Sequence, residues 1–137
     1  MAEKFKVSVI TPDRVFYDGE TELIILTGTA GAFAVMRDFQ PAVIPLKIGS
    51  LKIRNEDGSY SAAACGSGLL TMSPSNEATV LLDSAEWIDE IDLERAIESK
   101  KRAEQRLNIE SQEVDYVRAK AALQRAINRI KLSEMKK

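Results

Sequence analysis

The sequence predicts an α+β fold in which an N-terminal all-β sandwich is followed by a C-terminal antiparallel two-helix hairpin. Short hydrophobic segments separated by turn residues recur about every 8 to 12 residues in the first part of the chain, which is the spacing of an all-β sandwich. Between Ser84 and Ile88 the hydrophobic period changes from that of a strand to that of a helix. We therefore expect a sandwich domain of residues 1–85 and a helical hairpin of residues 86–137.

The first strand is predicted where Phe5, Val7 and Val9 alternate with polar residues, because alternate side chains of a strand share one face. The turn residues 11–14, with Pro12 among them, end this strand. Residues 55–58, Asn-Glu-Asp-Gly, have the composition of a hairpin turn. Further strands are expected near residues 15–17, 23–26, 42–44, 51–54, 59–65 and 79–82.

An internal repeat of arginines marks the C-terminal part. In each half the arginines stand 7 and then 4 residues apart, so they share one face of a helix. The short polar segment 108–112 suits the connection of two antiparallel helices. Asp89 is expected to cap the first helix, with Asp92 near the positive end of its dipole. The two predicted stripes are Arg95, Arg102 and Arg106, and Arg118, Arg125 and Arg129.

The apolar stripes of these helices are thin, because alanine occupies many of their positions. At about 25 cal/mol per Å² of buried apolar surface, an alanine-lined contact stabilises much less than a leucine-lined one. We therefore expect a hairpin that is marginally stable alone, as suits a moving part. An ordinary docked helical appendage is the alternative interpretation. The alanines expected in the stripes include Ala96, Ala103, Ala119 and Ala126.

The composition is that of a globular, cytosolic protein. The chain has 137 residues, 45% of them hydrophobic and 29% charged, and no hydrophobic run approaches the roughly 20 residues of a membrane span. Residues 1–6 lack the pattern of a signal segment, and the single cysteine, Cys65, cannot form an internal disulfide. Residues 88–137 hold 12 basic and 10 acidic residues, against 7 and 11 in residues 1–87. This asymmetry indicates either an anionic partner or a solvated basic helix face.

Catalytic groups are scarce. The sequence contains no histidine, which removes the usual general base and most zinc sites. Cys65 is expected to be a buried structural thiol. Residues 28–31 and 66–68 contain glycines but lack the lysine and helix start of a phosphate-binding loop, so we interpret them as turns. The acidic residues suit turns and helix caps as well as paired catalytic carboxylates. We expect neither enzymatic activity nor a required metal.

A series of motifs runs along nearly the whole chain. In the sandwich they are residues 9–13, 15–17, 27–31, 45–46, 48–53 and 80–86. In this order they resemble the epsilon subunit of the bacterial F-type ATP synthase. Ile91–Ala96 is similar to the Ile-Asp-x-x-Arg-Ala motif of the family members that bind ATP. The chain departs from the family where residues 34–40 replace a Gly-Ile-Leu-Pro-x-His run, and where Gly66-Ser67-Gly68 replaces a Gly-Gly pair.

The resemblance implies a non-catalytic rotor subunit. Its sandwich would bind the gamma subunit and rest on the ring of c subunits, helping to couple proton or sodium flow to rotation. Such a chain would be peripheral on the cytoplasmic face of the bacterial plasma membrane, held there only through the complex. The residues implied for the c-ring contact are Thr29, Ala30, Gly31, Ala32, Arg37 and Asp38.

The resemblance also implies that the hairpin is regulatory. Extended toward the alpha and beta subunits, it would block ATP hydrolysis through Arg118, Arg125 and Arg129, and ATP would bind and hold its folded form. Repulsion among so many arginines, unless an anion lies between them, supports this hypothesis. The residues implied for ATP binding are Glu86, Ile91, Asp92, Arg95, Ala96, Arg102, Arg125 and Arg129.

Two other classes of function remain open at this stage. The basic second helix would suit a small nucleic-acid-binding adaptor that contacts phosphates. Against this, only 6% of residues are aromatic, and Tyr116 alone lies in that helix, so bases have no stacking platform. A sandwich enzyme would need a catalytic group that the sequence does not provide.

Overall fold

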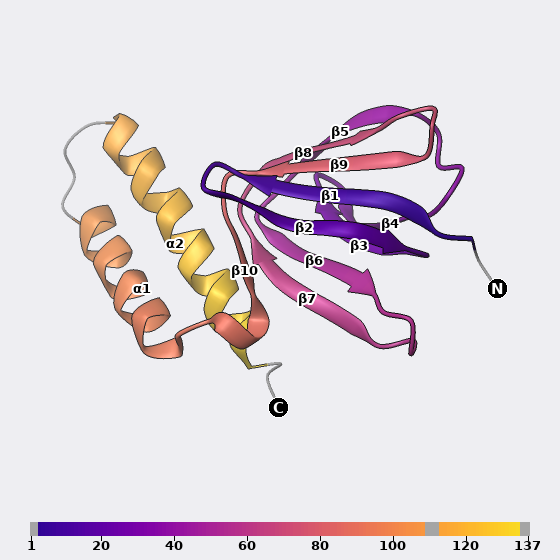
Figure 1. The fold of residues 1–137 in the computed structure, drawn as a ribbon. Helices are drawn as coiled ribbons and strands as arrows, with labels where there is room; N and C mark the ends of the chain where they lie inside the picture. The colour runs from indigo at the N-terminus through magenta and orange to yellow at the C-terminus, as the bar shows by residue number, and fades with distance from the viewer. Residues whose placement is uncertain (1–2, 109–112, 135–137) are drawn as a thin grey trace. The chain divides into compact units, whose positions relative to one another are not determined.

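The computed structural model describes residues 3–108 and 113–134, which belong to two compact units, Met1–Trp87 and Ile88–Lys137 (Figure 1). The described part of the first unit is built of strands and that of the second unit of helices. The predicted fold class is therefore confirmed. The last strand of the first unit continues past Ala85 to Trp87.

The first unit is a ten-stranded sheet with the order β10-β7-β6-β3-β5-β8-β9-β1-β2, and β4 pairs with β3. β1 and β9 pair in parallel, whereas the other neighbours are antiparallel. The strands are β1 Phe5–Thr11, β2 Arg14–Thr21, β3 Ile24–Gly28, β4 Gly31–Val35, β5 Ala42–Leu46, β6 Gly49–Arg54, β7 Tyr60–Cys65, β8 Gly68–Met72, β9 Glu77–Leu82 and β10 Ala85–Trp87.

The sheet folds into two layers around one hydrophobic core. The layers join between β3 and β5, where Gly28 lies opposite Leu46 as their one paired position. Alternate residues of both layers point inward, as predicted for the first strand. Val7 and Val9 of β1 and Leu51 of β6 are all fully buried in the same cluster. Burial of these aliphatic side chains is the main force that holds the sandwich together.

β4, β8 and β10 were not predicted from the sequence. β4 is short, and Ala32 and Ala34 on its outer side leave little alternation to detect. β10 has only three residues, which pair with β7 from Ala85 opposite Cys65 to Trp87 opposite Ala63. Such segments become strands through the neighbour they pair with, because their own composition specifies little.

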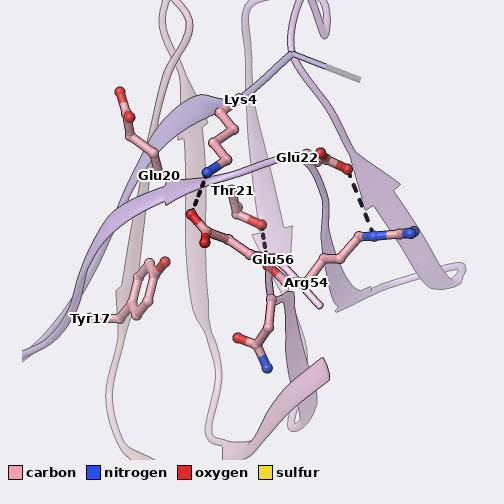
Figure 2. Close-up of a pocket in the computed structure, with 8 residues that line it drawn as sticks. Lys4, Tyr17, Glu20, Thr21, Glu22, Arg54 and Glu56 are labelled. Carbon is pink, nitrogen blue, oxygen red and sulfur yellow. Dashed lines mark hydrogen bonds and ion pairs between the residues drawn. The ribbon is translucent and has the colours of Figure 1, made fainter. Parts of the chain in front are cut away.

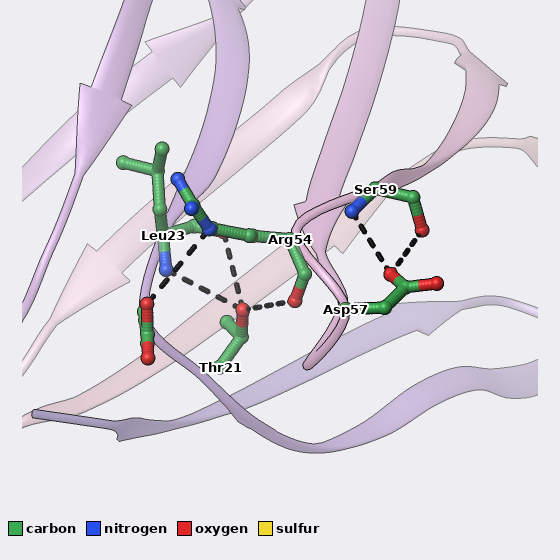
Figure 3. A network of polar contacts seen from close by, with 6 residues as sticks. Thr21, Leu23, Arg54, Asp57 and Ser59 are labelled. Atoms are coloured by element: carbon green, nitrogen blue, oxygen red, sulfur yellow. Dashed lines mark hydrogen bonds and ion pairs between the residues drawn. The ribbon is translucent and has the colours of Figure 1, made fainter. Parts of the chain in front are cut away.

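Side chains close the gap between β2 and the opposite layer. The Phe16 ring of β2 stacks on Trp87 of β10 with 4.4 Å between centroids. Near the other end of β2, the Thr21 hydroxyl donates to the Arg54 carbonyl at 2.7 Å, and the Leu23 amide donates to the Thr21 hydroxyl at 3.4 Å (Figure 3). Thr21 is 2% exposed, so its hydroxyl satisfies backbone groups that burial would otherwise leave unpaired.

The turns of the sandwich gather at two opposite ends. The Lys4 end holds residues 3–4 and the turns after β2, β4, β6 and β8, whereas the Asp83 end holds the turns after β1, β3, β5, β7 and β9. The predicted turn at residues 55–58 is present at the Lys4 end. There the Gly58 amide donates to the Asn55 carbonyl at 3.0 Å, and Gly58 has φ 88°, a conformation that suits glycine.

The second unit is an antiparallel helical hairpin (Figure 1). A 3-10 turn, Ile88–Glu90, precedes α1, Leu93–Asn108, and α2 spans Glu113–Ser133. Ala96, Ala103, Ala119 and Ala126 are each at most 2% exposed. These four residues, here called the seam alanines, lie where the helices pack, so the predicted alanine-lined contact is confirmed. Residues 109–112, part of the predicted connection, lie outside the described residues.

The prediction that Asp89 caps the first helix is wrong. Asp89 belongs to the 3-10 turn, and Asp92 is the capping residue. Its Oδ1 accepts the Arg95 amide at 3.2 Å, and its carbonyl accepts the Ala96 amide at 3.0 Å. Ile91, which directly precedes this cap, is buried at 2% exposure. The cap satisfies one of the backbone N–H groups left free at the start of a helix.

Candidate functional site

Six arginines form one face of the hairpin. An arginine directly precedes each seam alanine, and another stands three residues after Ala103 and after Ala126. One residue back is a rotation of about 100° and three residues forward about 300°, so all six leave their helices on the same flank of the seam. In an antiparallel pair these flanks lie on one side. This arginine face consists of Arg95, Arg102, Arg106, Arg118, Arg125 and Arg129.

The six arginines divide into two groups along the helix axes. Because α1 ends at Asn108 and α2 begins at Glu113, Ala96 lies beside Ala126 and Ala103 beside Ala119. The centres of the groups are about 14 Å apart at a rise of about 1.5 Å per residue. The open-end arginines, near the start of α1, are Arg95, Arg125 and Arg129, and the turn-end arginines are Arg102, Arg106 and Arg118.

Small side chains separate the two groups. Ser99 of α1 and Ala122 of α2 lie at the same level on this flank of the seam, and both are half-buried. Arg102 reaches toward them, since its Nη2 donates to the Ser99 Oγ at 3.1 Å. The Arg102 guanidinium therefore points toward the start of α1, where the open-end arginines lie. Ser99 was not among the residues predicted from the sequence, although an i, i+3 spacing of serine and arginine is a visible signal.

The five exposed arginines of this face are not neutralised by the glutamates of α1. Within the described residues, Glu94, Glu98 and Glu104 form no ion pair with any of these five. Arg129 is half-buried, and the other five arginines are exposed. A row of guanidinium groups that repel one another is stabilised by a bound anion. Guanidinium groups also suit phosphates, since they remain charged and donate paired hydrogen bonds.

The other residues expected to bind ATP have different surroundings. Asp92, exposed, is the N-cap of α1 and lies near the open-end arginines. Ile91 is buried, and Ala96 is 0% exposed within the seam, so it supports the helix pair from inside. These residues share the second unit with the arginines. Glu86 lies in β10 of the first unit, half-buried.

The residues expected to contact the c-ring lie toward the two ends of β4. Thr29 and Ala30 form its turn with β3 at the Asp83 end, and all six residues are exposed. Arg37 and Asp38 belong to the Lys4 end. The Arg37 Nε lies 2.9 Å from the Glu3 carboxylate, and the Asp38 amide donates to the Asn76 Oδ1 at 2.7 Å. Only a surface that runs along β4 could touch both groups, and β4 pairs with β3 alone among the described strands.

A row of exposed apolar side chains crosses the outer face of five neighbouring strands. Ile10 of β1 lies opposite Val15 of β2 and Leu81 of β9, and Leu81 lies opposite Leu69 of β8. Leu69 in turn lies opposite Pro45 of β5. The exposure of the four aliphatic residues ranges from 36% at Ile10 to 63% at Val15, and Pro45 is also exposed. A contiguous apolar surface of this kind is typical of a protein docking site. We call these five residues the apolar row.

A polar pocket opens at the Lys4 end (Figure 2). Its volume is about 200 Å³, and the Lys4 Nζ crosses it to the Glu56 Oε1 at 2.8 Å. This hydrogen bond raises the pKa of Lys4 and lowers that of Glu56. Glu22 and Arg54 form a longer ion pair of 3.8 Å. The residues that line the pocket are thus paired with one another. The lining residues are Lys4, Tyr17, Glu20, Thr21, Glu22, Arg54, Asn55 and Glu56.

Cys65 is a buried structural thiol, as predicted. It is 7% exposed in the sandwich core, and burial raises its pKa to about 12. Such a group is protonated near neutral pH and is a poor nucleophile.

The described residues lack two further features, a cluster of metal ligands and a membrane-spanning helix. No group of three or more acidic, cysteine or histidine side chains among them is arranged to hold a metal ion. Neither described helix has the length and hydrophobicity that a membrane span requires.

Comparison with known proteins identifies the family. A family model described as the ATP synthase, Delta/Epsilon chain, beta-sandwich domain matches residues 4–88, and its long alpha-helix counterpart matches residues 89–134. The chain belongs to the ATP synthase epsilon family. The ATP synthase epsilon chain of Caldicellulosiruptor bescii is 44% identical over 137 residues, covering 100% of this chain and 98% of the relative. That of Bacillus velezensis is 41% identical over 91% of this chain and 93% of the relative.

Solved structures agree with this fold. A chain of the Euglena gracilis mitochondrial ATP synthase, in an assembly of OSCP, F1 and c-ring, superposes with a TM-score of 0.78 at 16% identity, covering 91% of this chain and 78% of that one. A chain of the Tetrahymena thermophila mitochondrial ATP synthase, described as central stalk and c-ring, gives 0.66 at 17% identity over 96% and 98%. The expectation of a non-catalytic subunit agrees with the epsilon family.

Proposed function

We propose that this epsilon-family chain is a central-stalk subunit of a bacterial F-type ATP synthase that couples ion flow through the c-ring to rotation and restrains ATP hydrolysis. The observation that carries the proposal is the match of both units to epsilon domains, together with six arginines on one face of the second unit. The chain itself would be peripheral, held at the cytoplasmic face of the membrane through the complex.

The sandwich contributes the docking surfaces. The apolar row supports docking of the gamma subunit, since burial of exposed apolar side chains is the main driving force of protein association. The free edge of β4 supports a contact with the c-ring, along the strand from Thr29–Ala32 to Arg37 and Asp38. Coupling requires the sandwich to turn with both partners, and two separate surfaces allow both contacts at once.

The hairpin contributes the regulation. ATP binds the open-end arginines and Arg102, and stabilises the folded hairpin. In the extended form, Arg118, Arg125 and Arg129 meet an acidic region of the alpha and beta subunits and block hydrolysis. A ligand shifts such an equilibrium only by its difference in affinity for the two states, so ATP opposes inhibition. The alanine-lined seam supports this mobility, because it buries little surface.

Calorimetry with ATP on the isolated chain tests the ligand. The wild-type chain should release heat on binding, and an Asp92→Ala/Arg95→Ala variant should bind more weakly. No binding by either protein at millimolar ATP would refute the site, and equal binding by both would show that it lies elsewhere.

Inhibition is tested with a variant that removes charge from one face only. Replacing Arg118, Arg125 and Arg129 by alanine should relieve inhibition of a matching ATPase, because attraction to an acidic partner falls with each lost cation. The matched control replaces Lys101, Lys120 and Lys131, three exposed cations off the arginine face, by alanine. Equal effects of the two triple variants would contradict a specific contact.

A further inference from the structure

We propose that Ser99 is a positioning residue of the nucleotide site, whose hydroxyl holds the Arg102 guanidinium over the phosphates of bound ATP. This inference rests on the proposed binding of ATP by the hairpin. It assigns a role to a residue outside the Ile91–Ala96 motif and outside the set of expected ligands.

The position of Arg102 requires such a residue. By its place on α1, Arg102 belongs to the turn-end arginines, about 10 Å along the axis from Arg95. Its hydrogen bond to the Ser99 Oγ, 3.1 Å long, turns the guanidinium toward the open end. Arg102, one of the turn-end arginines, thereby directs its charge toward the three open-end arginines. Without the bond, the same side chain is free to point at solvent or at Arg106.

The surface between the two groups leaves room for phosphates. Ser99 and Ala122 carry the smallest side chains on the arginine face, and neither projects beyond the guanidinium groups on either side. A triphosphate has the charge and the extended form to lie over these two residues. Its two ends then approach arginines from both groups. Ser99 is thus small enough to leave this room free, and it acts on the ligand through Arg102.

Pre-positioning strengthens binding through entropy. A long arginine side chain loses rotamer freedom when it is fixed on a ligand. The hydrogen bond to Ser99 restricts those rotamers before the ligand arrives, so less freedom is lost on binding. The effect is confined to ligands that carry phosphates at Arg102. It should therefore distinguish ATP from AMP.

The test is a double-mutant cycle read by calorimetry with the full-length chain. Ser99→Ala should raise the Kd for ATP about threefold to tenfold, the range expected for one lost hydrogen bond. Ser99→Thr, which keeps the hydroxyl, should bind nearly as the wild type does. Ser99→Ala in an Arg102→Ala background should cause no further loss, because Ser99 acts through Arg102. The Kd for AMP should be the same with and without the Ser99 hydroxyl.

Alanine is a better helix former than serine, so weaker binding by Ser99→Ala cannot come from an unfolded hairpin. Additive losses from Ser99→Ala and Arg102→Ala, or an equal loss for AMP, would overturn the positioning role while leaving ATP binding intact. Unchanged ATP affinity in Ser99→Ala would do the same. Absence of ATP binding by the wild-type chain would overturn both this inference and the proposed regulation.

Discussion

The apolar row gives a quantitative prediction for gamma binding. Leu69 and Leu81 are direct cross-strand neighbours and are 43% and 45% exposed. Full burial of a leucine side chain stabilises by about 2 kcal/mol, so covering the exposed part of each contributes about 1 kcal/mol. Replacing both by serine should therefore weaken binding by about 2 kcal/mol, or roughly 30-fold in Kd. Titration of a purified gamma subunit, followed by surface plasmon resonance or calorimetry, measures this change.

The hairpin offers a matched control. Leu93 and Ile127 are 44% and 45% exposed, and replacing both by serine removes a similar exposed apolar area from the second unit. This control should leave the affinity of the sandwich for gamma unchanged. Because the substituted side chains point away from the core, thermal unfolding of the Leu69→Ser/Leu81→Ser variant should remain close to that of the wild type. A folded variant that binds gamma with wild-type affinity would refute the docking surface.

Three further predictions concern individual features. Asp92→Ala should destabilise the hairpin by about 1 kcal/mol through the lost cap, whereas Asp92→Asn should retain most of it, as measured by helical circular dichroism on heating. Cys65, with a pKa raised to about 12, should resist iodoacetamide at pH 8 in the native chain and react once the chain is unfolded, as mass spectrometry would show. A fragment of residues 1–87 should unfold cooperatively and bind gamma without inhibiting hydrolysis. A fragment of residues 1–84 should melt at a lower temperature, because it lacks β10 and the ring of Trp87.

Much of the fold could be predicted because its signals are periodic. The alternation of Phe5, Val7 and Val9 and the seven-residue spacing of the seam alanines both identify a buried face without knowledge of any partner. β4 and β10 could not be found in this way, since neither has a strong pattern and each depends on the strand beside it. Asp89 and Asp92 are equally good caps by composition. Only the structure distinguishes them, because Asp89 lies in the 3-10 turn and α1 begins at Leu93, directly after Asp92.

Of the two candidate surfaces, one could be predicted from the sequence and the other could not. The arginine face could be predicted, because its members repeat within single helices. The apolar row could not, because Ile10 and Leu81 become neighbours only through the pairing of β1 with β9, which are far apart in sequence, and Leu69 joins them only through the register of β8 with β9. The polarity of one strand does not reveal which residue of the next lies beside it. Ser99 was missed because its role depends on the direction of one side chain, that of Arg102.

The seam alanines also fix the width of the arginine face. Helices packed through small side chains approach to about 8 Å between axes, whereas larger side chains at the contact hold them nearer 10 Å. Alanine at positions 96, 103, 119 and 126 therefore sets the spacing between the guanidinium groups of α1 and those of α2. The buried contact between the helices therefore determines the geometry of the exposed arginine face. The seam alanines do not contact the ligand, yet they determine how wide an anion can be and still contact arginines of both helices.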